Sequence, residues 1–391
     1  MTDDDPRIYR IWLQHALGAG STKPNRILTG YPSLRDFYSA GRQAWLLEGY
    51  FTRKEIMAMD AWPVEKAEAL LEYCSRLGQR VVTPDDNEYP ELLRQIPNPP
   101  CALYVRGDLS CLDGRPAIAI VGTRRATATG RSAARSIAFE LAKQGAVVVS
   151  GGALGVDTAA HQGALQAGGK TVCVLGCGLD AEYLMANASL RDAAAANGAL
   201  ISEYPPGTQP MSSNFPIRNR IISGLSLGTL VVEAAARSGS LITADFALDQ
   251  GRDVFAVPAD IFSPVSQGVN SLIKSGAKPV SRAEEILEEY SGRFSEKIFL
   301  DGGKTHDMIK DNGMLPQERN AAAAAVDACS EDAKQVFAAL TEKPVPLSEL
   351  GSKAKLPPQR LLPAITELEL EGAIKTYSGG RYSLPHLSLK Y

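Results

Sequence analysis

The sequence has no strong excess of charge of either sign. Its 41 Lys and Arg residues are nearly balanced by 44 Asp and Glu residues, so the formal net charge is -3 and the isoelectric point is near 5.9. Proteins that bind nucleic acid through a general electrostatic field are strongly basic. The composition excludes such a field, and any site for a polyanion must be a local patch of basic side chains.

The sequence is also poor in metal ligands and membrane signals. Its six cysteines are scattered without a C-x-x-C pair, and its four histidines lie far apart. Zinc sites need such ligands at close, regular spacing, so we expect buried, reduced thiols and no metal or other cofactor. The acidic N-terminus MTDDDPRIYR lacks the apolar segment of a signal peptide, and no apolar run reaches 18 residues. We therefore expect a cytoplasmic protein without a membrane partner.

The chain is long enough for two or three domains, and its pattern divides it into four segments. Residues 1–78 have apolar residues at helical spacing, as in IYRIWLQHALGAG and AWPVEKAEALLEYCSRLG. The turn in LGAGSTKPNRIL is similar to a helix-hairpin-helix turn, which binds phosphates through backbone N–H groups, but an ordinary turn between helices explains it equally well. Residues 291–328 have no sustained period and are predicted to be a linker.

Short apolar runs dominate residues 79–290, with helix-like segments between most of them. The runs are RVVTP, ALYVRG, AIAIVGT, AVVVSGG, TVCVLG, ALISEY, TLVVEA and DVFAVP. Near-continuous apolar strands that alternate with helices are typical of a parallel sheet covered on both faces. The predicted fold class is therefore α/β, a Rossmann-like, doubly wound, mostly parallel sheet. Its ligand site should lie beyond the carboxyl ends of the strands.

Residues 329–391 predict a winged helix, with three helices and a two-stranded hairpin around Gly379-Gly380. The third helix has one cation near its start, Arg360. Acidic residues crowd its second half: Glu367, Glu369 and Glu371. Helices that enter a DNA major groove usually present basic and amide groups. We therefore predict a protein-docking or regulatory role for this domain.

Four predicted strands end in loops of small or basic residues, and in a parallel sheet these loops share one edge. Glycine lets a backbone approach a phosphate closely, and the following helix offers unpaired N–H groups. Several such loops, with arginines nearby, indicate a polyanion site. The loops are Thr123-Arg124-Arg125, Ala153 to Asp157, Cys177 to Asp180, and Ala235 to Ser240, which ends in Ser238-Gly239-Ser240.

The segment NFPIRNRIISGLS places an aromatic ring and two arginines before an apolar run. Pro216 biases Phe215 toward an extended conformation. In an extended stretch Arg218 and Arg220 share one face, and both can reach one row of phosphates. If a helix begins near Ile217 instead, the two arginines diverge and only one reaches the ligand.

Two interpretations of these side chains remain open. In the first, a base stacks on Phe215, a contact that tolerates any sequence and requires single strands. In the second, Phe215 fills the core and the arginines pair with Glu233 or Asp245.

The known enzyme motifs are incomplete in this chain. Gly176-Cys177-Gly178 lacks the third Gly of a dinucleotide fingerprint, and GALQAGGKT has the wrong glycine spacing and position for a P-loop. Asp157 and His161 share a helix face, but a helix cap and a loop-ordering hydrogen bond explain them better than an acid–base pair, because no nucleophile or metal set accompanies them. Glu233 closes a strand, where a carboxylate can be catalytic or can orient one of the two arginines.

Six segments together resemble the DNA-processing protein A (DprA/Smf) family. They are VGTRRAT, SGGALGVDTAAH, ISEYPPG, FPIRNRIISGLS, VVEAAARSGSLITADFAL and GRDVFAVP. The resemblance implies a Rossmann-like domain, often flanked by an N-terminal sterile-alpha-motif-like (SAM-like) helical domain and a C-terminal winged helix. It further implies a non-enzymatic protein that binds single-stranded DNA, forms homodimers through the Rossmann-like domain and loads RecA recombinase during natural transformation.

Carried over by position, the resemblance assigns DNA contacts to the first residues of VGTRR, to the glycine loop after the next strand and to FPIRNR. With the Ser-Gly-Ser loop, the predicted DNA-binding residues are Thr123, Arg124, Gly151, Gly152, Phe215, Arg218, Asn219, Arg220, Ser238, Gly239 and Ser240. Three positions depart from the family pattern: Thr123 replaces Ser, Gly152 replaces Leu and Ala259 replaces Gly. The chain also has Met-Ser-Ser-Asn where a basic residue often precedes the Phe-Pro pair, which predicts a weaker phosphate contact.

We predict a single-stranded DNA-binding recombination mediator. An enzyme on the same fold, a nucleotide or phosphoribosyl hydrolase similar to the lysine-decarboxylase-like group, is the alternative. That group has a PGGxGT-x-x-E loop, which RSGSLITA does not match. Candidate dimer segments are VFAVPADIF and VNSLI, although most of their residues are expected in the core.

Overall fold

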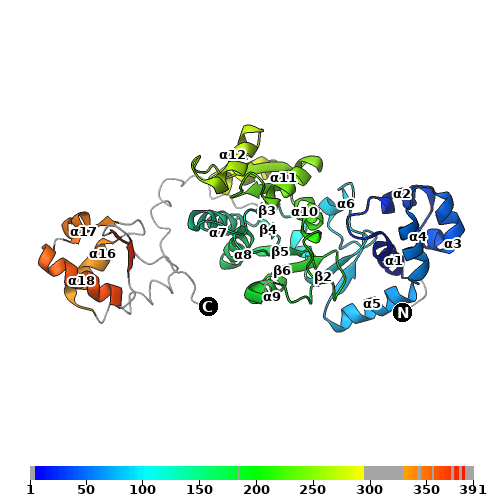
Figure 1. The fold of residues 1–391 in the computed structure, drawn as a ribbon, viewed down its shortest axis with the longest axis horizontal. Coiled ribbons are helices and arrows are strands. Elements are labelled where there is room, and N and C mark those ends of the chain that lie inside the picture. The colour runs from blue at the N-terminus through cyan, green and yellow to red at the C-terminus, as the bar shows by residue number, and fades with distance from the viewer. Residues whose placement is uncertain are drawn as a thin grey trace. The chain divides into compact units, whose positions relative to one another are not determined.

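The structure is a computed structural model that describes residues 5–183, 185–294, 329–340, 345–354, 356–370, 374–377 and 381–383. The chain divides into two compact units, residues 1–300 and 301–391 (Figure 1). The first unit holds a group of N-terminal helices and a large sheet, and the second holds the small C-terminal domain. The predicted linker falls almost entirely outside the described residues.

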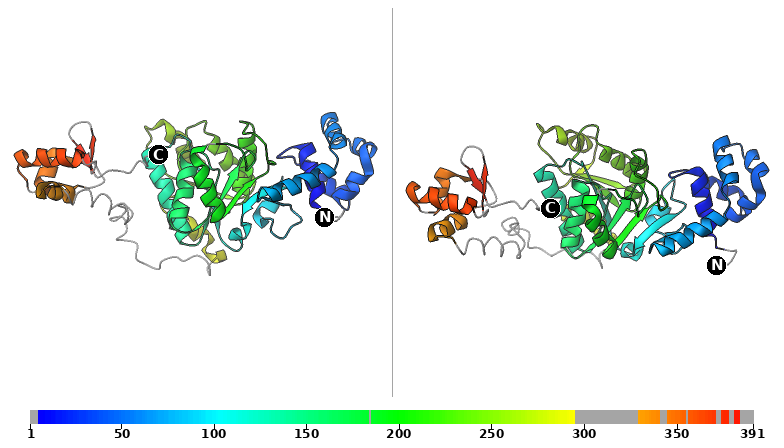
Figure 2. Two further views of the ribbon diagram at one scale, coloured as in Figure 1. Left: turned by 90° about the horizontal axis from the view of Figure 1, so that it is seen from below. Right: turned by 60° about the horizontal axis from the view of Figure 1, so that its bottom comes forward.

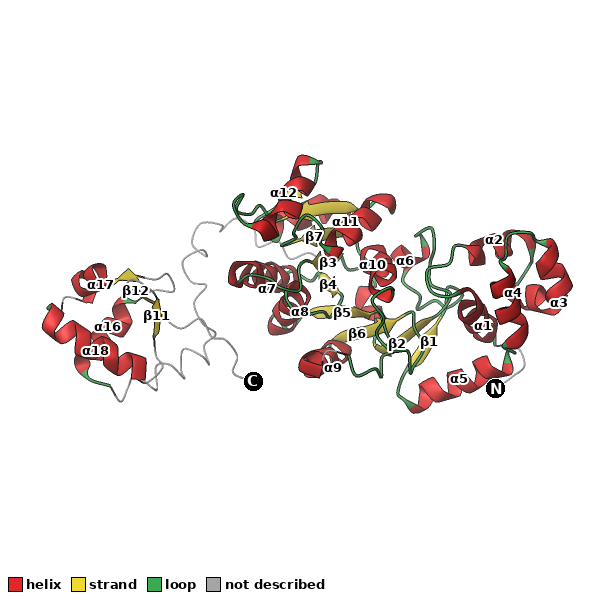
Figure 3. Cartoon of the chain, viewed as in Figure 1, coloured by secondary structure: helices red, strands yellow, loops and turns green. Residues whose placement is uncertain are grey.

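Residues 7–76 are helical, as their apolar spacing predicts. The helices are α1 (Arg7–Leu17), α2 (Lys23–Gly30), α3 (Leu34–Leu47), α4 (Arg53–Ala61) and α5 (Glu65–Arg76) (Figure 3). They bury Trp12 and Phe37 completely, and the same apolar cluster continues into the sheet through Tyr104 and Leu200. The N-terminal helices therefore share a core with the sheet and belong to the same compact unit.

The sheet has nine strands in the order β1-β2-β6-β5-β4-β3-β7-β8-β9. The strands are β1 (Arg80–Val82), β2 (Leu103–Gly107), β3 (Ala117–Val121), β4 (Val147–Ser150), β5 (Lys170–Leu175), β6 (Gly198–Ser202), β7 (Gly228–Val231), β8 (Asp253–Ala256) and β9 (Lys278–Pro279). From β6 to β9 all neighbours are parallel, whereas β1 and β2 are antiparallel additions. The chain runs outward from β3 to β6, returns to β7 beside β3, and runs outward again. The switch point of this doubly wound sheet therefore lies between β3 and β7.

Helices cover both faces of the sheet, which explains why its strands are apolar at nearly every position (Figure 2). In β3, Ala119 and Val121 enter one core, and Ile118 and Ile120 enter the other. The first core is completed by α6 (Glu91–Arg94), α10 (Asn214–Gly224), α11 (Gly239–Asp249) and α12 (Gln267–Lys274). The second is completed by α7 (Ala128–Lys143), α8 (Val156–Gln166), α13 (Glu284–Leu287) and α14 (Ser291–Phe294). Helix α9 (Ala188–Ala196) packs in the cluster shared with the N-terminal helices.

The C-terminal unit contains the three predicted helices and the predicted hairpin. Its elements are α16 (Glu331–Ala339), α17 (Leu347–Ala354), α18 (Pro358–Leu370), β10 (Val345–Pro346), β11 (Lys375–Tyr377) and β12 (Arg381–Ser383). The short β10 pairs with β12, so the wing has a third strand that the sequence reasoning missed. Arg360 Nε donates to Asp332 (2.8 Å), and Ser330 N donates to the Glu367 carboxylate (2.8 Å). These two charged side chains of α18 thus hold α16, while Glu371 and the side chain of Glu369 lie outside the described residues.

The six cysteines are buried thiols, as predicted. Within the described ranges, none of the helices combines the length and apolar composition that a membrane span requires. The same residues contain no cluster of His, Cys, Asp and Glu suited to holding a metal ion.

Candidate DNA-binding pocket

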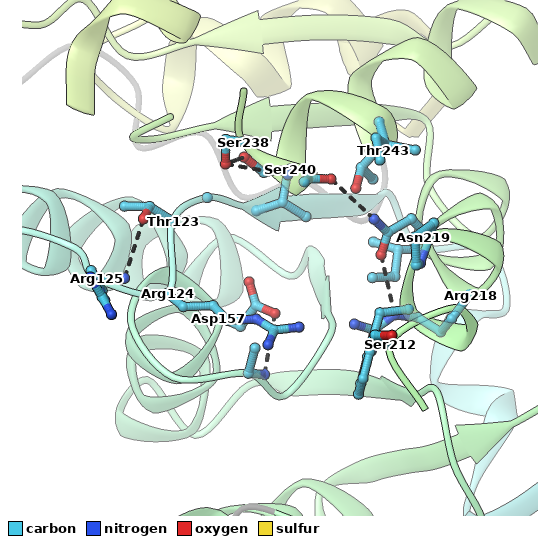
Figure 4. Close-up of a pocket in the computed structure, with 18 residues that line it drawn as sticks. Thr123, Arg124, Arg125, Asp157, Ser212, Arg218, Asn219, Ser238, Ser240 and Thr243 are labelled. Atoms are coloured by element: carbon cyan, nitrogen blue, oxygen red, sulfur yellow. Dashed lines mark hydrogen bonds between the residues drawn. The ribbon is translucent and has the colours of Figure 1, made fainter. Parts of the chain in front are cut away.

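A pocket of about 600 Å³ opens at the carboxyl ends of β3 and β7, the switch point of the sheet (Figure 4). Four segments meet there: the loop after β3, the loop after β4, the start of α10, and the loop after β7 that leads into α11. The lining residues are Val121, Gly122, Thr123, Arg124, Arg125, Ala153, Asp157, Ser212, Phe215, Pro216, Arg218, Asn219, Ile222, Ser238, Gly239, Ser240, Ile242 and Thr243. Open α/β sheets bind their ligands at this position.

Helix α10 begins at Asn214, so FPIRNR is helical and not extended. Pro216 fits because the first turn of a helix has no use for its missing N–H. At about 100° per residue, Phe215, Arg218, Asn219 and Ile222 share one face, which is the face that lines the pocket. The prediction that both arginines share a face is wrong for this backbone, and the alternative with diverging arginines is confirmed.

Arg218 enters the pocket from α10 as an almost fully buried guanidinium. Its Nη1 donates to Gly151 O (2.7 Å) and to Val174 O. A Cβ on Gly151 would lie 2.7 Å from both Arg218 Nη2 and Asp157 Oδ2, so only glycine leaves room for these two side chains. Burial lowers the pKa of Arg218 and raises that of Asp157, and each charge opposes the shift of the other. Within the loop after β4, Gly151 therefore fixes Arg218 and does not itself line the pocket, whereas Ala153 does.

Phe215 is half-buried and is surrounded by cations and a second ring. The guanidinium carbons of Arg124 and Arg218 lie 5.0 Å and 5.7 Å from its ring centroid, and the Tyr183 ring lies 5.2 Å away at 35°. Arg124 and Arg218 reach inward from opposite sides of the pocket (Figure 4). Phe215 is therefore not a core residue: its ring is partly buried, and it also lines the pocket.

The loop after β7 brings a helix N-terminus to the opposite wall. Ser238 caps α11, its Oγ lying 3.4 Å from Ser240 N and 2.8 Å from Ser240 Oγ. Asn219 Nδ2 donates to Gly239 O (3.3 Å) and ties this wall to α10. The N-terminus of an 11-residue helix favours anions through its partial positive charge and free N–H groups. Arg218, Arg124 and this helix end together make the pocket suited to phosphate.

Arg220 does not line the pocket, so its predicted role as a ligand contact is wrong. Its side chain is 2% exposed and pairs with Glu203, Nη2 lying 2.6 Å from Oε1. Glu233 and Asp245 were the expected partners of the two arginines, but Arg220 pairs with Glu203 and Arg218 donates to backbone carbonyls. Glu233 Oε2 instead accepts from Thr127 N (2.8 Å) and braces the loop after β3. Glu233 O accepts from Thr123 N (2.7 Å) in the same loop.

Asp157 and His161 do not form an acid–base pair with each other. Asp157 accepts from Ala153 N (3.2 Å) in the preceding loop, whereas the N-cap of α8 is Gly155 and no side chain caps this helix, so the predicted helix cap is wrong. His161 Nδ1 lies 2.7 Å from Thr171 Oγ1, and that hydroxyl donates to Val148 O, so Nδ1 carries the proton. Burial, and then Arg218, lower the pKa of His161 to about 4. His161 is therefore a neutral core residue that orders strands, not the loop-ordering residue expected from the sequence.

Most of the predicted binding residues come together in this one pocket. Thr123, Arg124, Phe215, Arg218, Asn219, Ser238, Gly239 and Ser240 line it. Gly151 lies behind Arg218, Gly152 O accepts from Asn187 Nδ2 (3.2 Å), and Arg220 lies elsewhere. Sequence reasoning missed Ser212 and Thr243, which line the pocket, and Tyr183, whose ring packs against Phe215. The signal for Tyr183 was its place in the loop after the strand VCVLG, since such loops lie at the ligand edge of the sheet.

The fold and the site define a Rossmann-like protein with a basic, aromatic-lined ligand pocket at its switch point. A family model described as "DNA recombination-mediator protein A" matches residues 80–291, and one described as "DprA winged helix domain" matches residues 319–380. The first match covers more than half of the chain and contains the whole pocket. The chain therefore belongs to the DNA recombination-mediator protein A family, also called DprA/Smf, as its motifs indicated.

Relatives and solved structures agree with this assignment. The chain is 43% identical to the DNA processing protein DprA of Bacillus subtilis over 55% of this chain and 73% of that protein. It is 35% identical to the protein Smf of Escherichia coli over 84% of each chain. The structure of DprA from Streptococcus pneumoniae superposes with a TM-score of 0.56 at 38% identity, covering 60% of this chain and 81% of that one. DprA from Helicobacter pylori, whose structure concerns a single-stranded DNA binding mode, has a TM-score of 0.50 at 32% identity, covering 55% and 96%.

Proposed function

We propose that this protein binds single-stranded DNA in the switch-point pocket and acts as a non-enzymatic recombination mediator. The single observation that carries the proposal is the arrangement around Phe215. An aromatic ring, two guanidinium groups and a helix N-terminus face one cavity of about 600 Å³. Such a set can bind a base and its neighbouring phosphate at once.

The pocket favours single strands over duplex DNA. A base can stack on Phe215 only when it has left its own stack, and the exposed Arg124 can leave the ring and pair with a phosphate. The chain has no general positive field that would bind duplex backbone, since its net charge is -3. The single-stranded DNA binding mode of the H. pylori relative supports the same choice of ligand.

Family membership supports a finer proposal. We infer that the DNA-bound protein loads RecA recombinase onto incoming single strands during natural transformation. The competing function, a nucleotide or phosphoribosyl hydrolase, finds little support in the pocket. The carboxylate Glu233 is committed to Thr127 N, and Asp157 lies against Arg218.

One experiment separates these functions. Binding of single- and double-stranded DNA is titrated at several salt concentrations, and release of product from nucleotides is assayed on the same preparation. We expect tight, salt-dependent binding of single strands, at least tenfold weaker binding of duplex, and no turnover. Turnover without a preference for single strands would show that the hydrolase assignment is right.

Deletion of residues 329–391 is expected to leave single-strand affinity within about twofold of the parent. In the described part of this domain, the side chains of Arg360 and Glu367 are engaged by Asp332 and Ser330, so α18 has little to offer a phosphate backbone. Fluorescence anisotropy with a labelled oligonucleotide measures the change. A loss of tenfold or more would assign DNA contacts to the winged helix.

We also propose a homodimer formed through the α/β domain. Of the candidate segments, Phe255 and Val269 are buried in the core, whereas Ile261 and Phe262 are 76% and 87% exposed. Large apolar side chains with this exposure favour an interface. The full chain is expected to sediment as a dimer at micromolar concentration, and replacement of Ile261 and Phe262 by Ser is expected to shift it toward monomer. A monomeric parent chain would contradict the proposal.

A further inference from the structure

A buried polar connection lies behind α10, on the side away from the pocket. Arg220 Nη2 donates to Glu203 Oε1 (2.6 Å), and the two side chains are 2% and 3% exposed. Glu203 directly follows β6, so this ion pair links α10 to the end of a central strand. Burial raises the pKa of Glu203, and Arg220 and a backbone N–H oppose that shift. Both charges therefore depend on each other in a site without bulk solvent.

The backbone N–H comes from the N-terminal helices. Gly20, in the turn between α1 and α2, donates its N–H to the same Oε1 of Glu203 (3.2 Å). A Cβ on Gly20 would lie 2.9 Å from Ile217 Cγ2 of α10, and its φ of +78° favours glycine. Asn98 Nδ2 donates to Gly20 O (3.1 Å) and holds the turn from outside. The turn that is similar to a phosphate-binding turn thus binds a carboxylate of its own chain.

A second residue of the N-terminal helices fixes the backbone of Glu203. Gln14 of α1 donates from Nε2 to Glu203 O (2.6 Å) and to Ala102 O (3.1 Å), and accepts from Ala102 N (2.7 Å). Gln14 is buried, so these bonds lie inside the shared core. Together, Gln14 and Gly20 hold both the main chain and the carboxylate of Glu203.

The two faces of α10 are thereby joined. Ile217 and Arg220 lie three residues apart and face the Gly20 turn, while Phe215 and Arg218 lie three residues apart and face the pocket. A helix moves as a rigid body over this length, so a shift of its rear face moves the ring and the guanidinium in front. We propose that the N-terminal helices position the DNA pocket through Gly20, Glu203 and Arg220, with Arg220 a positioning residue. This inference rests on the proposed function, because the pocket that α10 positions is the one proposed to bind DNA.

The test compares the full chain with the variants Arg220→Met, Gly20→Ala and Arg10→Met. Arg10 is the matched control, since its buried side chain also joins the N-terminal helices to the α/β domain, but through Asp85 (2.8 and 2.7 Å), which is not part of α10. Single-strand affinity is measured over a range of salt, and hydrogen exchange of the peptide covering residues 214–224 is measured without DNA. Thermal melting confirms that each variant is folded.

We expect Arg220→Met to bind about tenfold more weakly with an unchanged log–log salt slope, because no phosphate contact is lost. Gly20→Ala should show the same loss of affinity with an unchanged slope. Both variants should raise hydrogen exchange in residues 214–224, and the affinity loss of the double variant should be smaller than the sum of the two single losses. Arg10→Met should change neither affinity nor that exchange. Gly20→Ala leaves the ion pair in place, so it tests the inference even if Arg220→Met does not fold.

Three results would overturn the inference. A fall of roughly 0.7 in the slope for Arg220→Met would make Arg220 a direct phosphate contact. Equal losses in Arg10→Met would mean that general destabilisation is the cause. Unchanged exchange and affinity in Arg220→Met and Gly20→Ala would mean that the connection does not position α10. If the parent chain binds no single-stranded DNA, the proposed function fails, whereas the exchange measurement still decides whether the N-terminal helices hold α10.

Discussion

Arg218→Ala is expected to weaken single-strand binding about 100-fold and to lower the log–log salt slope by roughly 0.7. Arg218 is a guanidinium held in one place by Gly151 O and Val174 O, so its charge faces the pocket without further ordering. Removing such a fixed, desolvated charge costs more than removing a mobile one on the surface. Anisotropy titrations between low and high salt measure both quantities.

Two further variants separate charge from stacking. Arg124→Ala should lower the slope by the same roughly 0.7 but cost only about tenfold in affinity, because Arg124 is exposed and has to leave the Phe215 ring to reach a phosphate. Phe215→Ala should weaken binding by about tenfold or more with the slope almost intact, since stacking releases no counterions. Lys143→Ala, at the far end of α7 from the pocket, is the control and should change neither value. If Arg218→Ala, Arg124→Ala and Phe215→Ala all bind like the parent, DNA binds elsewhere.

The sheet and the pocket edge could be predicted because their signals are local. Runs such as AIAIV are apolar at every position, as a strand with two buried faces must be, and the loops that follow them have to share one edge. Thr123, Arg124 and Ser238 could therefore be placed at the site before any contact was known.

Arg220 could not be placed in this way. The position of its side chain depends on Glu203, 17 residues earlier, and on Gly20 in a different part of the chain. The local sequence pattern marks neither residue as a partner of Arg220. The same holds for the N-terminal helices. Their spacing predicts helices, but only the packing of Trp12 and Tyr104 in one cluster shows that they share a core with the sheet. A single sequence does not show which buried charges pair when they lie far apart in the chain.

The unfolding free energy of the α/β domain is expected to fall by about 3 kcal/mol as the pH drops from 6.5 to 4, through His161 alone. The pKa of His161 is about 4 in the folded chain and 6.5 in an unfolded one. Between these values the unfolded chain takes up a proton that the folded chain refuses, so acid favours unfolding, and the full stability is present above pH 6.5. The cause is structural, because the ring is buried, donates from Nδ1 to Thr171 and lies near the positive Arg218.

His161→Asn isolates this contribution, because the amide nitrogen of Asn can donate where Nδ1 does and Asn does not titrate. Asp157 works in the opposite direction, since burial raises its pKa and the folded chain keeps its proton longer as the pH rises. His15 also has a lowered pKa, through burial and Lys66. Both groups are present in the parent and the variant, so their contributions cancel in the difference between the two unfolding free energies. These are measured by urea unfolding, followed by circular dichroism at several pH values.

We expect that difference in unfolding free energy to change by about 3 kcal/mol between pH 6.5 and 4 and to be flat from pH 7 to 8. A difference that is flat across the whole range would mean that His161 takes up its proton in the folded chain as readily as in the unfolded one, and would contradict a neutral, buried His161.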